Sequence, residues 1–246
     1  MTHTSTAETN SPAPPCDRAG STTALHVGGF DVEVEHARTL IDQYVHPADG
    51  IVTGFGHYDH LATGAPATGP LIDADLLAPN LLNAPVDLKR FAALQDLRDE
   101  MQAALDPIPA HADLAEADDE TIELLGPLFA VLDSLAASRR GIGPVIYSKV
   151  LHRKRPGLVP IIDTNVMWCY CHDHERHAPV PIQRGRNWAD FTLALAYAMR
   201  TDLQHAPASW TELAAVASPS MTRLRALDIV AWRTGNHPRR ADDVRS

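Results

Sequence analysis

The sequence predicts an all-α globular fold. Apolar residues recur at helical spacing in successive segments that Pro and Gly separate, and no pair of segments carries a convincing β-hairpin signal. The 246 residues are 45% hydrophobic and 21% charged, a globular composition that excludes a wholly disordered or collagen-like chain. We therefore expect one helical domain over residues 26–246, either undivided or in two lobes, 26–138 and 139–246.

Residues 1–25 are expected to form a disordered tail. They are rich in Thr, Ser, Pro and Ala and lack the apolar region of a secretory signal. No run in the chain is long and apolar enough for a transmembrane helix, so no membrane partner is expected. The three Cys residues do not suggest a disulfide framework. Together these features predict a cytoplasmic location, and they leave the oligomeric state open.

Helix positions follow from apolar spacing and from capping residues. Val34, Ala37, Ile41 and Tyr44 share one side of the first expected helix. Segment 54–69 is rich in Gly, His, Thr and Pro, and we expect an ordered loop there. The expected helices cover about 34–44, 73–82, 91–105, 127–138, 144–152, 163–170, 187–199 and 220–235.

Charge is distributed unevenly along the chain. Residues 1–138 hold 5 basic and 22 acidic side chains, a sum of −17, and residues 139–246 hold 16 basic and 9 acidic, a sum of +7. This polarity suggests that a polyanion, DNA or a nucleotide, meets the C-terminal half. The alternative is a solvated surface with chance clustering of charge.

A glycine-rich turn separates the expected helices at 127–138 and 144–152. Gly141 and Gly143 flank Ile142, so the segment predicts a helix-hairpin-helix unit whose backbone N–H groups can bind an anion. The following helix carries basic residues at positions i, i+3 and i+4, which favour phosphate contact. The alternative is a structural helical hairpin with a solvated basic face. The predicted phosphate-binding residues are Arg140, Gly141, Gly143, Lys149 and Arg153.

Asp163 follows the short apolar run 158–162 and opens the next expected helix. As an N-cap, its carboxylate would accept backbone hydrogen bonds and contribute about 1 kcal/mol to stability. The same carboxylate could stabilise an oxocarbenium-like sugar and orient a water molecule, as carboxylates do in glycoside hydrolysis. These two roles are compatible.

The order Gly-Ile-Gly, helix, Pro-containing apolar run and Ile162–Val166 resembles the helix-hairpin-helix superfamily of base-excision DNA glycosylases. The resemblance implies a DNA-glycosylase-like fold, a hairpin that grips the DNA backbone, and Asp163 as the catalytic carboxylate. With segments 75–78 and 227–232, the same stretch resembles still more closely a family of bacterial proteins of unknown function.

Several residues depart from the glycosylase pattern. Val145 stands where bifunctional members carry a lysine, so strand-cleaving lyase chemistry is not expected. Arg139 and Arg140 replace the usual Leu-Pro, and Asn165 replaces a histidine. The four-Cys loop of some members is absent, so no iron–sulfur cluster and no other cofactor is expected.

Two further sets of residues are candidates for a site. Tyr58, His60 and Trp168 could stack on an extruded base, although each of these types is more often core or surface. Segment 169–177 is dense in Cys and His, but a helix would point Cys169 and Cys171 in different directions. A zinc site would require a loop geometry here. We favour the alternative, incidental enrichment at an exposed helix end, and so expect no metal.

Three functions are therefore open. The first is a monofunctional DNA glycosylase-like enzyme in which Asp163 assists cleavage of an N-glycosidic bond. The second is a noncatalytic helix-hairpin-helix module that binds nucleic acid or a protein. The third uses the same fold on a small nucleotide. An enzyme requires Asp163 to open toward a concave cavity, whereas a module would have it capped and covered.

Overall fold

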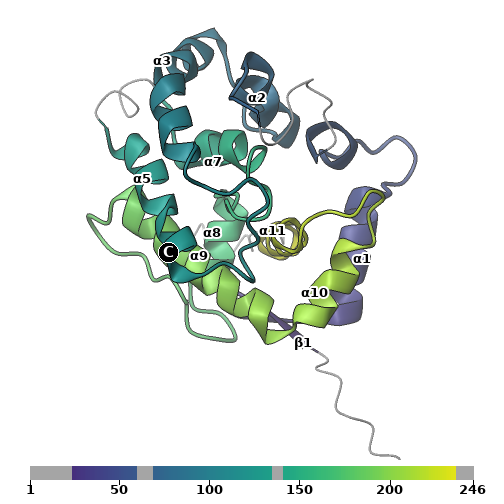
Figure 1. Cartoon of the computed structure of the whole chain (residues 1–246). Helices are drawn as coiled ribbons and strands as arrows, with labels where there is room; N and C mark the ends of the chain where they lie inside the picture. The colour runs from purple at the N-terminus through teal and green to yellow at the C-terminus, as the bar shows by residue number, and fades with distance from the viewer. Residues whose placement is uncertain (1–23, 60–68, 135–140, 237–246) are drawn as a thin grey trace, which may run out of the picture.

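The protein is described from a computed structural model that covers residues 24–59, 69–134 and 141–236, and it is mostly helical (Figure 1). In chain order the elements are β1 (Ala24–Val27), β2 (Phe30–Glu33), α1 (Val34–Val45), the π-helical turn η1 (Phe55–Asp59), α2 (Asp73–Leu77), the 3-10 helix η2 (Ala78–Leu82), α3 (Leu88–Leu105), α4 (Asp119–Glu123), α5 (Leu125–Ala130), the 3-10 turn η3 (Val131–Asp133), α7 (Pro144–His152), α8 (Thr164–Cys171), α9 (Trp188–His205), α10 (Pro207–Ala214) and α11 (Arg223–Gly235). None of these helices is long and apolar enough to cross a membrane.

The two-stranded sheet corrects the expectation of a purely α-helical chain. β1 and β2 pair antiparallel around Gly28 and Gly29, with Leu25 opposite Val32. The strand begins at Ala24, inside the segment predicted as a tail. Leu25 and Val27 are fully buried while their neighbours are partly exposed, which is the alternation of a half-buried strand. Residues 1–23 lie outside the described part of the chain.

The hairpin turn requires glycine at position 28. Gly28 has a φ of +61°, and a Cβ placed there would lie 2.4 Å from the backbone oxygen of Cys169. We expect Gly28→Ala to lower the free energy of unfolding by about 2–5 kcal/mol, from about 1–2 for the left-handed backbone and about 1–3 for the clash.

Gly185→Ala is the matched control for this prediction, since Gly185 has a φ of +81° but an added Cβ would meet nothing within 4 Å. We expect only the backbone cost there, about 1–2 kcal/mol. Urea denaturation of the two variants measures the difference. An equal decrease in the free energy of unfolding of both variants would show that the contact with Cys169 does not constrain Gly28.

Most predicted helices are confirmed, with shifted ends. The expected 73–82 helix is divided into α2 and η2, because Pro79 near the start of η2 has no N–H for the helical ladder. The expected loop at 54–69 contains η1, and α4 and α10 are helices that the apolar pattern did not predict. The expected 127–138 helix corresponds to α5 and η3 and ends earlier than predicted, because Ser134 after η3 is extended. Residues 135–140, at the start of the hairpin, fall outside the described residues.

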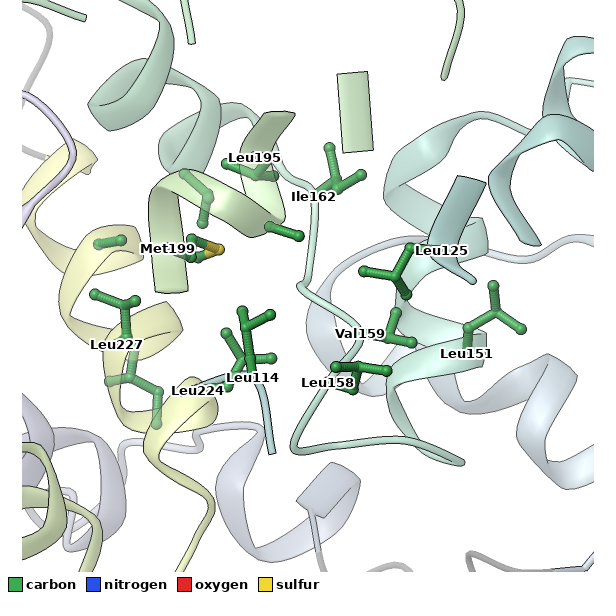
Figure 2. Close-up of a cluster of buried hydrophobic side chains, with 14 of the residues drawn as sticks. Leu114, Leu125, Leu151, Leu158, Val159, Ile162, Leu195, Met199, Leu224 and Leu227 are labelled. Atoms are coloured by element: carbon green, nitrogen blue, oxygen red, sulfur yellow. The ribbon is translucent and has the colours of Figure 1, made fainter. Parts of the chain in front are cut away.

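Helix α11 lies near the centre of the molecule, between α8, α1 and α10 (Figure 1). The core beside it combines side chains of α5, α7, α9 and α11 with those of the irregular segment 158–162 (Figure 2). That segment is buried without a sheet partner, so side chains of α7 satisfy its backbone: Ser148 Oγ accepts from the N–H of Ile162, and a ring nitrogen of His152 bonds the carbonyl of Val159. These bonds fix the path of the chain to Asp163.

Ion pairs between the two halves neutralise part of the charge asymmetry between them. Basic side chains of the C-terminal half form ion pairs with carboxylates of the N-terminal half, which reduces the excess charge expected to meet a polyanion. The pairs are Arg153 and Lys154 with Asp75, Arg176 with Asp31, Arg200 with Asp119, Arg223 with Asp113 and Glu116, and Arg225 with Asp59.

Candidate functional site

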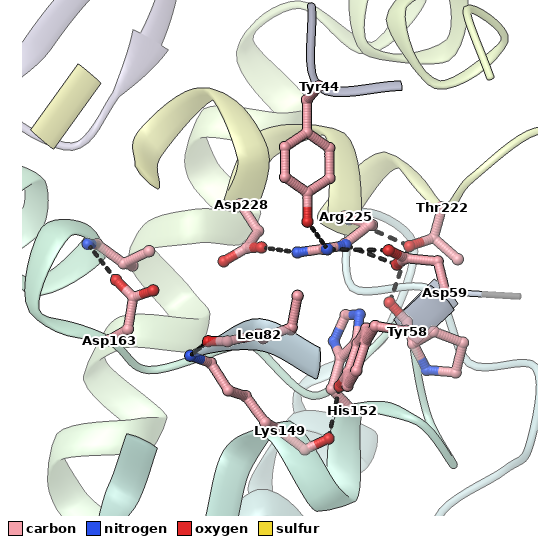
Figure 3. Close-up of polar contacts among 12 residues, drawn as sticks. Tyr44, Tyr58, Asp59, Leu82, Lys149, His152, Asp163, Thr222, Arg225 and Asp228 are labelled. Atoms are coloured by element: carbon pink, nitrogen blue, oxygen red, sulfur yellow. Dashed lines mark hydrogen bonds and ion pairs between the residues drawn. The ribbon is translucent and has the colours of Figure 1, made fainter. Parts of the chain in front are cut away.

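A cleft of about 450 Å³ lies between the start of α8, the first turns of α7, the end of η2 and one side of α11. The end of α1 and the loop at 51–54 complete its wall. The charged residues that line it are Lys149 on α7, Asp163 at the start of α8, and Arg225, Asp228 and Arg233 on α11. Figure 3 shows the first four of them. We call this space the Asp163 cleft.

Asp163 is the N-cap of α8 and also lines the cleft. Its Oδ1 accepts the backbone N–H groups of Asn165 at 3.0 Å and Val166 at 3.1 Å, which confirms the predicted capping role. Within the described chain, no hydrogen bond reaches Oδ2. The side chain is half-buried, so capping fixes the carboxylate without covering it.

Arg225 organises the opposite wall. Its guanidinium donates to both oxygens of Asp59, at 2.7 and 3.0 Å, to the Tyr44 hydroxyl oxygen at 3.0 Å, and to Oδ2 of Asp228. Burial acts to lower the pKa of Arg225, but the carboxylates of Asp59 and Asp228 outweigh it and raise that pKa above its ordinary value. Arg225 is therefore a fixed cation that holds η1, α1 and α11 together.

Asp228 is 3% exposed, and its two oxygens differ. Oδ2 meets Arg225, whereas Oδ1 is buried and has no hydrogen-bond partner among the described residues. Burial raises the pKa of Asp228 to about 7; Asp163 adds to this rise, and Arg225 and Lys149 oppose it. A carboxyl group with this pKa can exchange a proton near neutral pH.

Lys149 reaches the cleft from α7. Its Nζ donates to the carbonyl oxygen of Leu82 at 3.0 Å, at the end of η2. Burial lowers its pKa, and the nearby carboxylates of Asp163 and Asp228 oppose that change. Lys149 is thus a largely buried cation on the floor of the cleft, whereas the sequence predicts a solvent-facing one.

The other residues predicted to contact phosphate lie at different depths. Gly141 is exposed with a φ of +73°, and Gly143 caps α7 just before Val145, which lines the cleft. Arg153 lies behind the cleft, where it donates to the carbonyl oxygen of Tyr58 and pairs with Asp75 at 3.4 Å. Arg140 falls outside the described residues. Phosphate contact by these side chains stays a prediction.

Neither Tyr58 nor Trp168, two of the three predicted base-stacking residues, lines the cleft. Tyr58 is 1% exposed, and its hydroxyl donates to the carbonyl oxygen of Lys149, beneath the cleft. Trp168 packs against His172 and His174, with ring centroids 4.4 and 5.0 Å away, and it does not line the cleft. His60 falls outside the described residues. The aromatic rings on the cleft wall are instead those of Tyr44 and Trp232.

Segment 169–177 is divided between the core and the surface. Cys169 is buried and its thiol donates to the carbonyl oxygen of Ala231, and Cys171 is also buried. The ring of His174 stacks on Phe30. In the part of the chain that the structure describes, no group of three His, Cys, Asp or Glu residues could hold a metal ion.

Sequence reasoning missed Arg225 and Asp228. Both belong to the last predicted helix, whose apolar stripe suggested only a core helix. The available signal was an arginine and an aspartate at i and i+3 within that stripe, since buried charges of this kind require partners.

A comparison with protein families matches residues 37–235 to DUF6308, a family of unknown function. The chain belongs to this family. The expectation of a family of unknown function is thereby confirmed. The DUF6308 match begins in α1, ends with α11 and includes all the residues that line the Asp163 cleft. Searches of curated proteins and of solved structures returned no match, so neither gives support for the glycosylase resemblance.

Proposed function

We propose that the Asp163 cleft binds a nucleotide unit and that the protein hydrolyses its N-glycosidic bond, with Asp163 as the catalytic carboxylate. The observation that carries the proposal is the position of Asp163, which is fixed as an N-cap and at the same time lines a cavity. A residue that only caps a helix would not need to line a cavity. The resemblance to helix-hairpin-helix glycosylases at residues 141–166 supports the same reaction.

The chemistry needs an anion beside the sugar. Cleavage of the bond leaves positive charge on the sugar ring, and a fixed carboxylate at this point stabilises that charge and orients the attacking water. Oδ2 of Asp163 is suited to this role because Oδ1 is occupied by the backbone of α8. Trp232 and Tyr44 provide aromatic surfaces against which the base would rest.

We expect the phosphate to contact the backbone N–H groups of Val145 and Ile146 at the start of α7, since Pro144 before them has no N–H. Gly143 is the N-cap, a Cβ at this position would meet nothing within 4 Å, and Val145 connects this turn to the cleft. A helix N-terminus with open backbone is suited to an anion. Lys149 adds a positive charge on the cleft floor.

A free nucleotide is a second candidate substrate. Binding of duplex DNA depends on several basic side chains that neutralise phosphates. In this fold, Arg153, Arg200, Arg223 and Arg225 are paired with carboxylates of the same chain. That pairing favours a ligand with few phosphates.

Base release from a panel of substrates tests the proposed function. The panel contains damaged and undamaged bases, each in duplex and single-stranded DNA and as a free nucleoside and nucleotide, at two salt concentrations. We expect base release without strand cleavage, because Val145 stands at the lyase position.

The salt dependence of binding identifies the substrate, and base release tests the reaction. DNA as the substrate predicts binding that weakens steeply with salt, and a free nucleotide predicts a weak salt dependence. Binding without release would instead indicate a noncatalytic module. If the protein neither binds any of these substrates nor releases a base from them, the proposal is contradicted altogether.

A further inference from the structure

Asp228 lines the Asp163 cleft, and one of its two carboxyl oxygens has no partner in the described part of the chain. The side chain is 3% exposed, Arg225 contacts Oδ2, and Oδ1 is buried with no hydrogen-bond partner among the described residues. A buried polar atom without a partner destabilises the folded protein. Such an atom on the wall of a cavity points to a role in binding or catalysis.

Figure 3 shows Asp228, Asp163 and Lys149 around one space, on α11, at the start of α8 and on α7. The two carboxyl groups have different environments. Asp163 is half-buried and held by backbone N–H groups, whereas Asp228 lies beneath the surface against an arginine. Paired carboxyl groups in unlike environments are typical of an acid and an anionic partner in hydrolysis.

We infer that Asp228 is the general acid of the proposed reaction, and that its Oδ1 protonates the departing base. The inference rests on the proposed function and adds a second catalytic residue to it. It also defines the substrate class: nucleotides whose base must gain a proton in order to leave.

The proposed reaction is a hydrolysis that consumes one water molecule. The bond between the sugar C1′ and the base nitrogen breaks, its electron pair stays with the base, and the Asp228 carboxyl group gives its proton to the base. Water adds to C1′ beside the Asp163 carboxylate, and the proton that this water loses returns to Asp228. The products are the free base and the sugar hydroxyl, and both aspartates are restored.

The charges around Asp228 suit this role. Burial and Asp163 raise its pKa to about 7, while Arg225 on its own helix and Lys149 on α7 keep the rise moderate. Asp59 on η1 and Tyr44 on α1 are linked to Asp228 because both accept hydrogen bonds from the same Arg225 guanidinium. The catalytic form is the protonated one, so activity should fall as pH rises through about 7.

Two substrates that differ only in the need for an acid test this assignment. Deoxyguanosine needs protonation of its base, whereas 7-methyldeoxyguanosine already carries a positive charge on the base and leaves without it. Both are offered as nucleosides and within a duplex oligonucleotide. We expect Asp228→Asn to lower kcat/KM on the guanine substrate by about 10²–10⁴-fold, the usual effect of losing a general acid, and to leave the methylated one nearly unchanged.

Activity on the methylated substrate also shows that Asp228→Asn is folded. Asp202→Asn is the matched control, because Asp202 is equally buried, at 3% exposure, but lies outside the cleft. We expect this variant to treat both substrates as the wild type does. In the wild type, only release of guanine should fall as pH rises above about 7.

The outcomes separate the two proposals. Equal losses by Asp228→Asn on both substrates, or no loss on either, would overturn the role of Asp228 and leave the proposed function intact. A wild-type protein that releases neither base would overturn the role of Asp228, whereas the proposed function is overturned only if no base of the wider panel is released.

Discussion

Replacing Arg225 with leucine is expected to lower the free energy of unfolding by about 3–5 kcal/mol, the cost of removing one partner from a buried ion pair. Arg225 is 4% exposed and joins Asp59, Tyr44 and Asp228 from three separate elements. Without the guanidinium, buried Asp228 and largely buried Asp59 lose the cation that contacts both of them. Chemical denaturation measures the loss.

The loss should depend on pH. Without Arg225, the folded-state pKa of Asp228 rises further above its unfolded value, so stability falls as pH rises through that pKa. The destabilisation should therefore be greater near about pH 8 than near about pH 5. Arg38→Leu is the control. Because Arg38 is 40% exposed, its replacement should lower the free energy of unfolding by less than about 1 kcal/mol. A loss for Arg225→Leu no greater than for Arg38→Leu would contradict the role of Arg225.

The helices were predictable because their signals are local. Apolar spacing and caps place α1, α3 and α7 within three residues of their observed bounds, and they place the start of α9, whose end lies six residues beyond the predicted one. The β-hairpin was missed because each strand has only four residues, too few for a clear alternating pattern. Helix α10 contributes Trp210 and Leu213 to the core, and a helix of this length depends on tertiary packing more than on its own pattern.

The same distinction applies to the site. Asp163 was predictable as a cap, since its partners are the next residues of the chain. The direction of the basic residues on α7 was not, because it depends on segments far away in sequence. Lys149 donates to Leu82, and Arg153 meets Asp75 and Tyr58. A basic face that the spacing predicts at the surface is thus turned toward acidic and carbonyl groups inside.

Asp163→Asn is expected to remove the proposed activity and to preserve the fold. Loss of the carboxylate charge should reduce base release by about 10²–10³-fold, the usual effect of deleting one electrostatic contact to a transition state. Asparagine caps a helix about as well as aspartate, so the free energy of unfolding should change by less than about 0.5 kcal/mol. Asp118→Asn, at the cap of α4, is the matched control outside the cleft.

Base release in a single turnover, compared between the wild type, Asp163→Asn and Asp118→Asn, tests the central claim most directly. We expect release by the wild type and by Asp118→Asn, and a loss of about 10²–10³-fold in Asp163→Asn at unchanged stability. Equal release by all three proteins would contradict the assignment of Asp163 as the catalytic carboxylate.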